Sequence, residues 1–245
     1  MSRALDTGTD QLPAHVDDAG VLRITLNNPE RFNSLTADMM YGLQGAFATA
    51  SEDDDIRVVV LRGEGDQAFA SGADIGEQAE RAATGTRNPD RGMFLGQLRA
   101  CAKPVVALIH GYCIGGGVIV AMAADIRIAA DDATFAIPPG RLGVAYPLTA
   151  VEALVDIVGC GWAADLVLSG DRVDAMQALH MGLVTRVHPK ADADRLAEEL
   201  IQTIAGNAPL SMVASKASIG HANAVTRPPI DDIITMIDAV WASDD

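Results

Sequence analysis

Two glycine-containing stretches decide the fold of this chain: Phe69-Ala70-Ser71-Gly72-Ala73-Asp74-Ile75 and His110-Gly111-Tyr112-Cys113-Ile114-Gly115-Gly116-Gly117. Each comes after a run of apolar residues, Val58 to Leu61 in the first case and Pro104 to Ile109 in the second. Glycine allows a positive φ and a close approach of the backbone to a neighbour or a ligand. We therefore interpret both stretches as strand-to-helix junctions that present backbone N–H groups.

The apolar runs also indicate the class of fold. Neither Val58 to Leu61 nor Pro104 to Ile109 alternates with polar residues, as expected for central strands that are covered on both faces. Val21 to Leu26 does alternate, which is typical of a half-buried strand, and Thr36 then offers an N-cap for a helix. We therefore predict an α/β fold with a parallel sheet and helical crossovers. Further strands are expected at Ile126 to Ala130, Thr134 to Ile137 and Leu183 to Val187, with helices over 147–158 and 160–168.

The chain is expected to form one structural domain with two parts. Its 245 residues, 49% of them hydrophobic, are enough to bury one sizeable core, and no linker or internal repeat divides them. We assign residues 1–190 to the core and residues 191–245 to a helical C-terminal region, broken near 206–207 and 227–229. This region carries more apolar side chains than a small core requires, which predicts self-association through it: Leu210, Met212, Val213, Ile230, Ile233, Ile234, Ile237 and Val240.

The composition excludes several kinds of partner. A net charge of −15 repels nucleic acid and anionic membranes, because both are bound through clustered Lys and Arg. No segment has about 18 uncharged apolar residues and the N-terminus lacks an apolar signal region, which predicts a cytoplasmic protein. The three cysteines show no metal-ligand spacing, so we expect no metal site and three buried free thiols.

The two junctions together suggest a chemistry. Ala73 and Gly116 hold corresponding places in them, and the start of a helix favours negative charge. Two N–H groups that converge on one oxygen form an oxyanion hole, which stabilises the charge that develops in acyl chemistry. A glycine triplet alone is also common where a helix packs tightly, so the pair carries the argument.

These junctions lie in a chain that resembles the crotonase, or enoyl-CoA hydratase/isomerase, superfamily from about Val21 to Asp245. The matching stretches follow the family order: Ile24 to Pro29 with Asn33-Ser34-Leu35, Ala68 to Asp74, Lys103 to Ala107 with Gly111-Tyr112 and the glycine triplet, Ala123 to Ala129, Arg141-Leu142-Gly143, and Ala178 to Val184.

The resemblance implies a crotonase-type ββα spiral core, with the helical C-terminal region acting in trimerisation, as a trimer or a dimer of trimers. It implies that an acyl-CoA thioester binds with its oxygen at the N–H groups of Ala73 and Gly116. No cofactor beyond the CoA moiety of the substrate is expected. The CoA moiety would be contacted by the turn and loop residues Arg31, Phe32, Ser71, Gly72, Asp74 and Ile75.

The chain departs from the pattern at two positions. Hydratases of the family carry two glutamates that hold and activate water, and here these positions are Ile119 and Pro139. Neither side chain can transfer a proton, so ordinary hydratase activity is not expected. Members of the family usually carry a basic tail beyond the position of Asp245, and either such residues follow it or CoA is bound more weakly without that cationic contact.

The segment from Phe135 to Tyr146 resembles instead the methylmalonyl-CoA decarboxylase branch, which has a tyrosine where Tyr146 stands. That branch also carries a histidine at the position of Ala73 and a glutamate at that of Ile119, and both are missing. Tyr146 is therefore a candidate catalytic residue beside the alternative that it is a half-buried aromatic side chain.

Other polar residues favour structural interpretations. We expect His110 to serve packing, Asp74 to accept N–H bonds that hold its loop, and Glu77 and Glu80 to be solvated carboxylates rather than substitute bases. The hypothesis is thus an acyl-CoA-processing enzyme that stabilises a thioester enolate. An acyl-CoA decarboxylase and a non-catalytic acyl-CoA-binding protein remain as alternatives.

Overall fold

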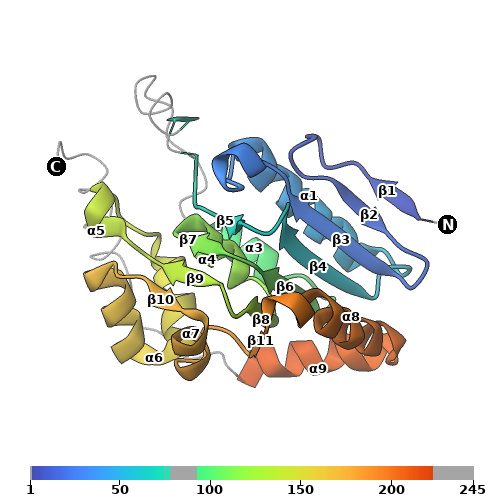
Figure 1. The fold of residues 1–245 in the computed structure, drawn as a ribbon. Coiled ribbons are helices and arrows are strands. Elements are labelled where there is room, and N and C mark those ends of the chain that lie inside the picture. Colours follow the sequence, from blue (N-terminus) through green and yellow to red (C-terminus); the bar gives the residue numbers. More distant parts are fainter. Residues whose placement is uncertain (1, 75, 78–92, 223–245) are drawn as a thin grey trace.

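A seven-stranded sheet forms the frame of the computed structural model, which describes residues 2–74, 76–77 and 93–222 (Figure 1). Five strands run parallel, and the first two strands of the chain extend one edge as an antiparallel hairpin. The spatial order is β1 (Arg3–Leu5), β2 (Ala14–Val16), β3 (Val21–Leu26), β4 (Val58–Gly63), β6 (Val105–Ile109), β8 (Ile126–Ala130) and β11 (Arg186–His188). The predicted parallel sheet is confirmed.

The short strands form a second, four-stranded sheet. Its strands lie in the order β10 (Val173–Asp174), β9 (Thr134–Ala136), β7 (Tyr112–Ile114) and β5 (Ala68–Ala70). Along the chain, each long strand β4, β6 and β8 is followed by one short strand, which makes the repeating ββα turn of the expected spiral. Both glycine junctions come after a long strand as expected, and each also contains residues of a short strand of this second sheet, β5 in the first and β7 in the second.

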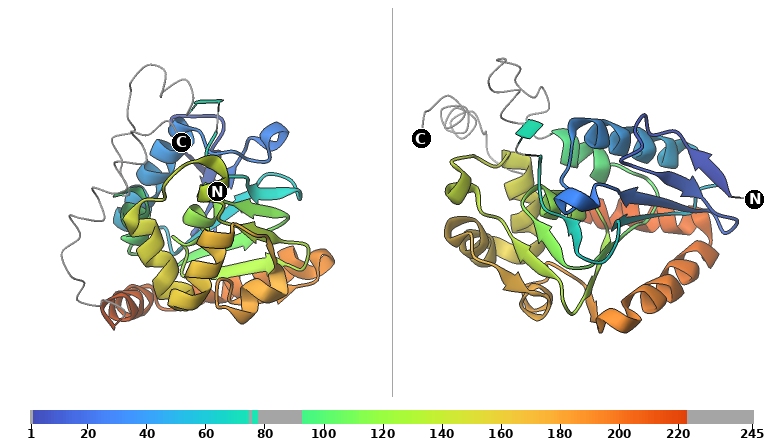
Figure 2. Two further views of the ribbon diagram at one scale, coloured as in Figure 1. Left: turned by 90° about the vertical axis from the view of Figure 1, so that its left-hand side faces the viewer. Right: turned by 45° about the horizontal axis from the view of Figure 1, so that its top comes forward.

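Helices cover both faces of the large sheet. Helix α8 (Lys190–Gly206) packs Ile201 and Ile204 against the valines of β4 and β6 on one face. Helices α1 (Ala37–Glu52) and α3 (Met93–Arg99) cover the opposite face, where Phe47 and Leu98 are fully buried. The helices α4 (Gly116–Ala121), α5 (Pro139–Leu142), α6 (Leu148–Ser169) and α7 (Ala175–His180) gather around the second sheet, as two further views show (Figure 2). The short 3-10 helix η1 (Pro29–Arg31) lies between β3 and α1 along the chain.

Several local predictions are confirmed and explain where elements begin and end. The Thr36 side chain accepts a hydrogen bond from the Met39 N–H and so caps α1. The two helical segments expected over 147–158 and 160–168 are the two halves of α6, which meet at Gly159 with φ of 76°. Only glycine adopts this left-handed conformation readily, so the helix bends there.

Two local predictions were wrong. The strand expected at Leu183 to Val187 begins at Arg186, because Leu183 and Val184 belong to the turn after α7 and fill the core there. Cys101 and Cys113 are buried free thiols as expected, whereas Cys160 is exposed at the bend of α6. Among the described residues, no helix is long and apolar enough to cross a membrane.

Helix α9 (Pro209–Ala222) lies at the border of the described chain. Leu210 and Ile219 are 85% and 70% exposed, in line with the surplus of apolar side chains in this region. Lys216 fastens the helix: its ammonium group donates to the Lys103 carbonyl and pairs with Asp125, both at 2.8 Å. The predicted helix after the break at 227–229, and the end of the chain, lie outside the described residues.

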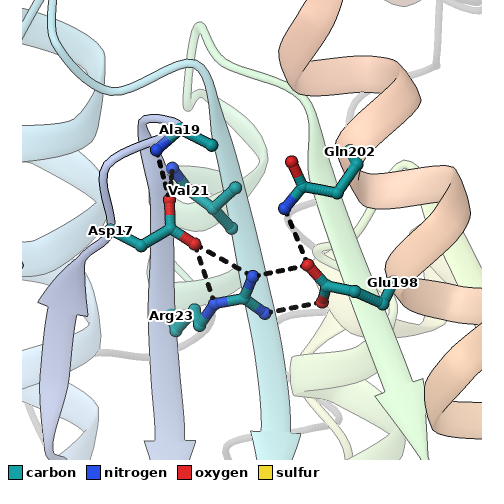
Figure 3. Close-up of polar contacts among 6 residues, drawn as sticks. All are labelled: Asp17, Ala19, Val21, Arg23, Glu198 and Gln202. Atoms are coloured by element: carbon teal, nitrogen blue, oxygen red, sulfur yellow. Dashed lines mark hydrogen bonds and ion pairs between the residues drawn. The ribbon is translucent and has the colours of Figure 1, made fainter.

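A network of charged groups fastens α8 to the sheet (Figure 3). The Arg23 guanidinium on β3 donates to both Glu198 oxygens at 2.9 and 2.8 Å and, through its other edge, to Asp17 at 3.1 and 3.0 Å. Asp17 also accepts the N–H groups of Ala19 and Val21, and Gln202 donates to Glu198. Every charged group in this network therefore has several partners.

Candidate active site at the two glycine junctions

The backbone of the first junction directs the N–H of Ala73 away from Leu35, the residue with which Ala73 forms a bridge. Leu35 donates its N–H to the Gly72 carbonyl at 2.8 Å and accepts the N–H of Asp74 at 2.9 Å. In an extended chain, successive residues direct their backbone polar groups to alternate sides. Since Gly72 and Asp74 serve the bridge to Leu35, the Ala73 N–H points to the other side.

The second junction brings the backbone of Gly116 beside Ala73. Gly116 is the first residue of α4, so its N–H has no acceptor within that helix. Gly115 takes φ of 57° and ψ of −115°, and its N–H is held by the Ala136 carbonyl at 2.8 Å. A Cβ on Gly116 would lie 3.2 Å from the Ala73 nitrogen, so the two backbones are in contact there.

The third glycine permits this approach. A Cβ on Gly117 would lie 2.3 Å from the Ala70 carbonyl oxygen, closer than any real contact allows, so the start of α4 can lie against β5 only with glycine here. Within the part of the chain that the structure describes, neither the Ala73 N–H nor the Gly116 N–H has a hydrogen-bond acceptor. Two adjacent, unsatisfied backbone donors can stabilise negative charge on one oxygen.

Tyr146 reaches the same junction from the segment between α5 and α6. Its hydroxyl oxygen lies 3.0 Å from the point that a Cβ on Gly115 would occupy, and its ring packs against the core. Burial, and to a smaller degree the nearby Cys113 thiol, raise the pKa of Tyr146. The hydroxyl is therefore protonated at neutral pH and can donate a hydrogen bond or a proton beside the two N–H groups.

Ile119 and Pro139 occupy apolar surroundings. Ile119 is half-buried on α4 and packs against the core. Pro139 is buried and opens α5, where a helix needs no backbone N–H. Neither residue offers a group that exchanges protons, and no group of three metal-binding side chains exists among residues 2–74, 76–77 and 93–222.

Asp74 holds the first junction in shape. Its side chain is only 7% exposed and accepts hydrogen bonds from the Glu77 N–H, the Arg31 guanidinium and the Ser34 hydroxyl, at 3.1, 2.8 and 3.1 Å. The Glu77 N–H, followed by Arg31, keeps the pKa of this carboxyl below its usual value. The expected loop-holding role of Asp74 is confirmed, and its carboxylate is directed into the loop rather than outward.

The other carboxylate near this loop also has a structural partner. Glu77 accepts the N–H of Ala37 at 2.9 Å and so satisfies a donor at the start of α1. The expectation that Glu77 is a solvated surface carboxylate was wrong, because the unsatisfied N–H groups of a helix start attract a negative charge. Ile75 and Glu80 lie outside the described residues.

Of the remaining residues predicted to contact CoA, Arg31, Phe32 and Ser71 lie at or near the surface, whereas Gly72 is buried. Ser71 donates its N–H to the Phe32 carbonyl and its hydroxyl to the Arg31 carbonyl, at 2.9 and 3.0 Å. Arg31 keeps 65% of its side chain exposed while one nitrogen meets Asp74. Gly72 is buried beside the start of α4, with φ of 109°. The turn and the loop thus form one connected surface.

His110 belongs to a different part of the molecule. Its buried ring bonds to Asp194 on α8 through Nε2 at 2.8 Å, which fits the expected packing role. Sequence reasoning did not identify Leu35 and Ser34 as supports of the site. Both residues belong to Asn33-Ser34-Leu35, a stretch that matches the family pattern, and this match was the signal that could have indicated their role.

The repeated ββα turns and the paired junctions define the crotonase superfamily, and the comparison with known proteins agrees. The family model described as "Enoyl-CoA hydratase/isomerase" matches residues 17–230, so the chain belongs to the enoyl-CoA hydratase/isomerase family.

Individual relatives are identical to this chain at about a third of the aligned positions. It is 31% identical to the peroxisomal Delta(3,5)-Delta(2,4)-dienoyl-CoA isomerase of Arabidopsis thaliana, over 93% of this chain and 87% of the relative. It is 33% identical to the 2,3-dehydroadipyl-CoA hydratase of Escherichia coli, over 84% and 80%. Among solved structures, an enoyl-CoA hydratase/carnithine racemase from Magnetospirillum magneticum aligns with a TM-score of 0.82 and 31% identity, covering 93% of this chain and 86% of that one.

Proposed function

We propose that this protein binds an acyl-CoA thioester with the thioester oxygen between the N–H groups of Ala73 and Gly116, and that it stabilises the enolate of that thioester. The observation that supports this most is the contact between the backbones of Ala73 and Gly116, whose N–H groups have no acceptor among the described residues. Ala73 and Gly116 are both partly exposed, so a ligand can reach these two donors and complete them.

In this proposal, Tyr146 is the proton donor. Its raised pKa keeps the phenol protonated, and an enolate carbon is basic enough to take that proton. For a thioester with a carboxylate on the α carbon, the bond to the carboxylate breaks, CO₂ leaves, and the electron pair enters the enolate. The α carbon then takes the Tyr146 proton, and water restores the phenol.

Hydration is not the reaction we propose, although relatives of the chain include hydratases. Water must be positioned and deprotonated as it adds to the β carbon, and each task is normally worth roughly 10²- to 10⁴-fold in rate. Ile119 and Pro139 stand where the family resemblance places the groups for these tasks. The same observation supports the second candidate, a non-catalytic acyl-CoA-binding protein.

We further propose that the protein uses no cofactor beyond the CoA moiety and assembles as a trimer or a dimer of trimers. The exposed apolar side chains on α9 support the assembly. Sedimentation at micromolar concentration tests it, and a monomer alone would rule it out.

The function is tested by three measurements on the purified protein: hydration of crotonyl-CoA, decarboxylation of malonyl-type CoA thioesters, and deuterium exchange at the α carbon of saturated acyl-CoA. We expect no appreciable hydration, and turnover in at least one of the other two. Tyr146→Phe should lower that turnover about 100-fold and leave thioester binding intact. Tyr41→Phe, at a tyrosine 53% exposed on α1, is the matched control.

The outcomes separate the candidates. Binding without any turnover favours the non-catalytic protein. Rapid hydration that Tyr146→Phe does not affect would show that another residue acts as the base and would reject the proposed chemistry.

A further inference from the structure

A groove lies at one edge of the large sheet, between β11 and α8. β11 is the last strand of that sheet and has a neighbouring strand, β8, on one side only. The groove has a volume of about 240 Å³, which is room for a small organic molecule. We call it the edge groove, and it is lined by two residues of β11 and four of α8: Arg186, His188, Leu196, Glu199, Leu200 and Thr203.

The spacing of these residues places them on two facing surfaces. Arg186 and His188 are two residues apart in a strand, so their side chains point to the same face. On α8, positions 196, 199, 200 and 203 follow the spacing of one helical stripe, beside the stripe that packs against the valines of β4 and β6. Leu196 and Leu200 are half-buried and supply the apolar part of the groove.

The backbone fixes the β11 wall of the groove at both of its ends. Asp131 donates its N–H to the His188 carbonyl and accepts the Lys190 N–H through its carboxylate, each at 2.9 Å. Before the strand, Thr185 donates its N–H and its hydroxyl to the Arg127 carbonyl, both at 2.8 Å. A site that is already ordered loses little entropy when a ligand binds.

Arg186 is a cation that the described structure leaves without a carboxylate. It is exposed, and within residues 2–74, 76–77 and 93–222 no Asp or Glu forms an ion pair with it. The carboxylate that lines the same groove, Glu199, pairs instead with Arg195 at 2.7 Å. Because a guanidinium can bind a carboxylate through two parallel N–H groups, Arg186 suits an anionic ligand.

His188 offers a second polar contact at the groove. Its Nε2 atom is buried and has no hydrogen-bond partner within the described part of the chain. Buried polar nitrogens are normally hydrogen-bonded, so a ligand group that reaches this atom gains affinity. In the tautomer that carries its proton on Nε2, the ring donates to a carboxylate.

We propose that the edge groove binds a small carboxylate with a short apolar chain. The carboxylate meets Arg186 and the His188 ring, and the chain lies over Leu196 and Leu200. A carboxylate of this kind fits better than inorganic phosphate, because the leucines provide apolar contact that phosphate cannot use. None of these residues belongs to the glycine junctions, so the inference is independent of the proposed function.

Four probes test the chemistry of the groove: hexanoate, acetate, inorganic phosphate and hexan-1-ol. Ligand-observed NMR titrations of the purified protein give the dissociation constant of each. We expect hexanoate to bind at least about tenfold more tightly than acetate, because its methylene groups leave water. Phosphate and hexan-1-ol, which lack the apolar chain and the charge respectively, should also bind at least about tenfold more weakly than hexanoate.

Variants of Arg186 test the place of binding. Arg186→Gln should weaken hexanoate about tenfold, because the charge-assisted hydrogen bonds are lost. Arg186→Lys keeps the charge without the planar fork and should have an intermediate affinity. Arg99→Gln is the matched control, because Arg99 is an exposed arginine at the end of α3, outside the groove, and it should keep wild-type affinity.

A competition experiment separates the groove from the glycine junctions. Saturating hexanoyl-CoA should leave the affinity for hexanoate unchanged. Displacement of hexanoate by hexanoyl-CoA would overturn the inference, as would wild-type affinity in Arg186→Gln, equal affinity for phosphate or hexan-1-ol, or no binding of hexanoate at all. A protein that binds hexanoate but not hexanoyl-CoA would reject the proposed function and support the edge groove.

Discussion

Two regions of the molecule differ in whether their polar groups have partners. One is the network of Asp17, Arg23 and Glu198 between β3 and α8, here called the seam, and the other is the pair of glycine junctions. In the seam, the Arg23 guanidinium is bonded on both edges, to Asp17 and to Glu198. At the junctions, the described structure offers no acceptor to the N–H groups of Ala73 and Gly116. Satisfied charges stabilise a fold, whereas preorganised donors without partners await a ligand. Changes in the seam should therefore alter stability, and changes at the junctions should alter chemistry.

The largest effect is expected at Gly116. A Cβ there lies 3.2 Å from the Ala73 nitrogen, so Gly116→Val places a branched side chain where the thioester oxygen must sit. Loss of one oxyanion donor typically lowers kcat by about 10²- to 10³-fold. Steady-state kinetics on whichever thioester the wild type turns over measures this loss, and thermal melting shows whether the fold survives.

Gly161→Ala is the control for this change, since no atom lies within 4 Å of a Cβ built on Gly161 in α6. It should leave turnover unchanged. Full activity in Gly116→Val would show that the thioester oxygen binds elsewhere.

A smaller effect, confined to stability, is expected in the seam. Arg23→Met removes the hydrogen bonds to Asp17 and Glu198 while keeping the aliphatic part of the side chain. The free energy of unfolding should fall by about 1 to 2 kcal/mol. This value allows for solvent screening of the pair, because Glu198 is partly exposed. Urea unfolding measures the change, and turnover should be unaffected.

The surface pairs of Arg195 with Asp192 and Glu199 on the same helix provide the comparison. Arg195→Met should cause no measurable change, because exposed pairs contribute little. An equal loss in both variants would remove the distinction between the seam and the open surface.

The smallest expected effect is the change with pH in the stability that the seam contributes. The Arg23 hydrogen bond holds the pKa of Glu198 below its usual value. Burial works to raise the pKa of Asp17, but the Val21 N–H and the Arg23 side chain outweigh it and lower that pKa. Groups with a lowered folded pKa stabilise the protein above their unfolded values, about 3.9 for Asp and 4.3 for Glu, and this contribution is lost as pH falls through the folded pKa.

The stability difference between wild type and Arg23→Met should therefore narrow as pH is lowered from 7 to below about 4. Urea midpoints at a series of pH values measure it. A difference that stays constant with pH would show that the network contributes packing rather than charge.

Much of the fold could be predicted from local sequence patterns. The uninterrupted apolar residues of β4 and β6, the N-cap Thr36 and the break at Gly159 each express a local preference that the tertiary structure keeps. The second sheet was missed, because strands as short as Ala68–Ala70 carry too few residues to show a period. Leu183 and Val184 misled the prediction, since apolar residues that fill a turn resemble a strand.

The candidate site was predictable in part. Glycine spacing and family resemblance indicated Ala73 and Gly116, and the structure brings their backbones into contact. Sequence could not show which way the Ala73 N–H points, because that depends on the pairing of Leu35 with its neighbours 72 and 74. It also missed that Glu77 caps α1, which is a contact over 40 residues of chain.

The bridge between Leu35 and Ala73 has a consequence for how this site can change over evolutionary time. The direction of the Ala73 N–H depends on its place in the alternation of the strand and hardly on its side chain. Substitutions at position 73 can therefore accumulate without turning the donor away, and they are free to reshape the surroundings of the acyl group. Deletion of a single residue between Ala70 and Ala73 would instead exchange the inward and outward N–H groups at once. The direction of this backbone donor is therefore more sensitive to insertions and deletions in the loop than to substitutions at position 73.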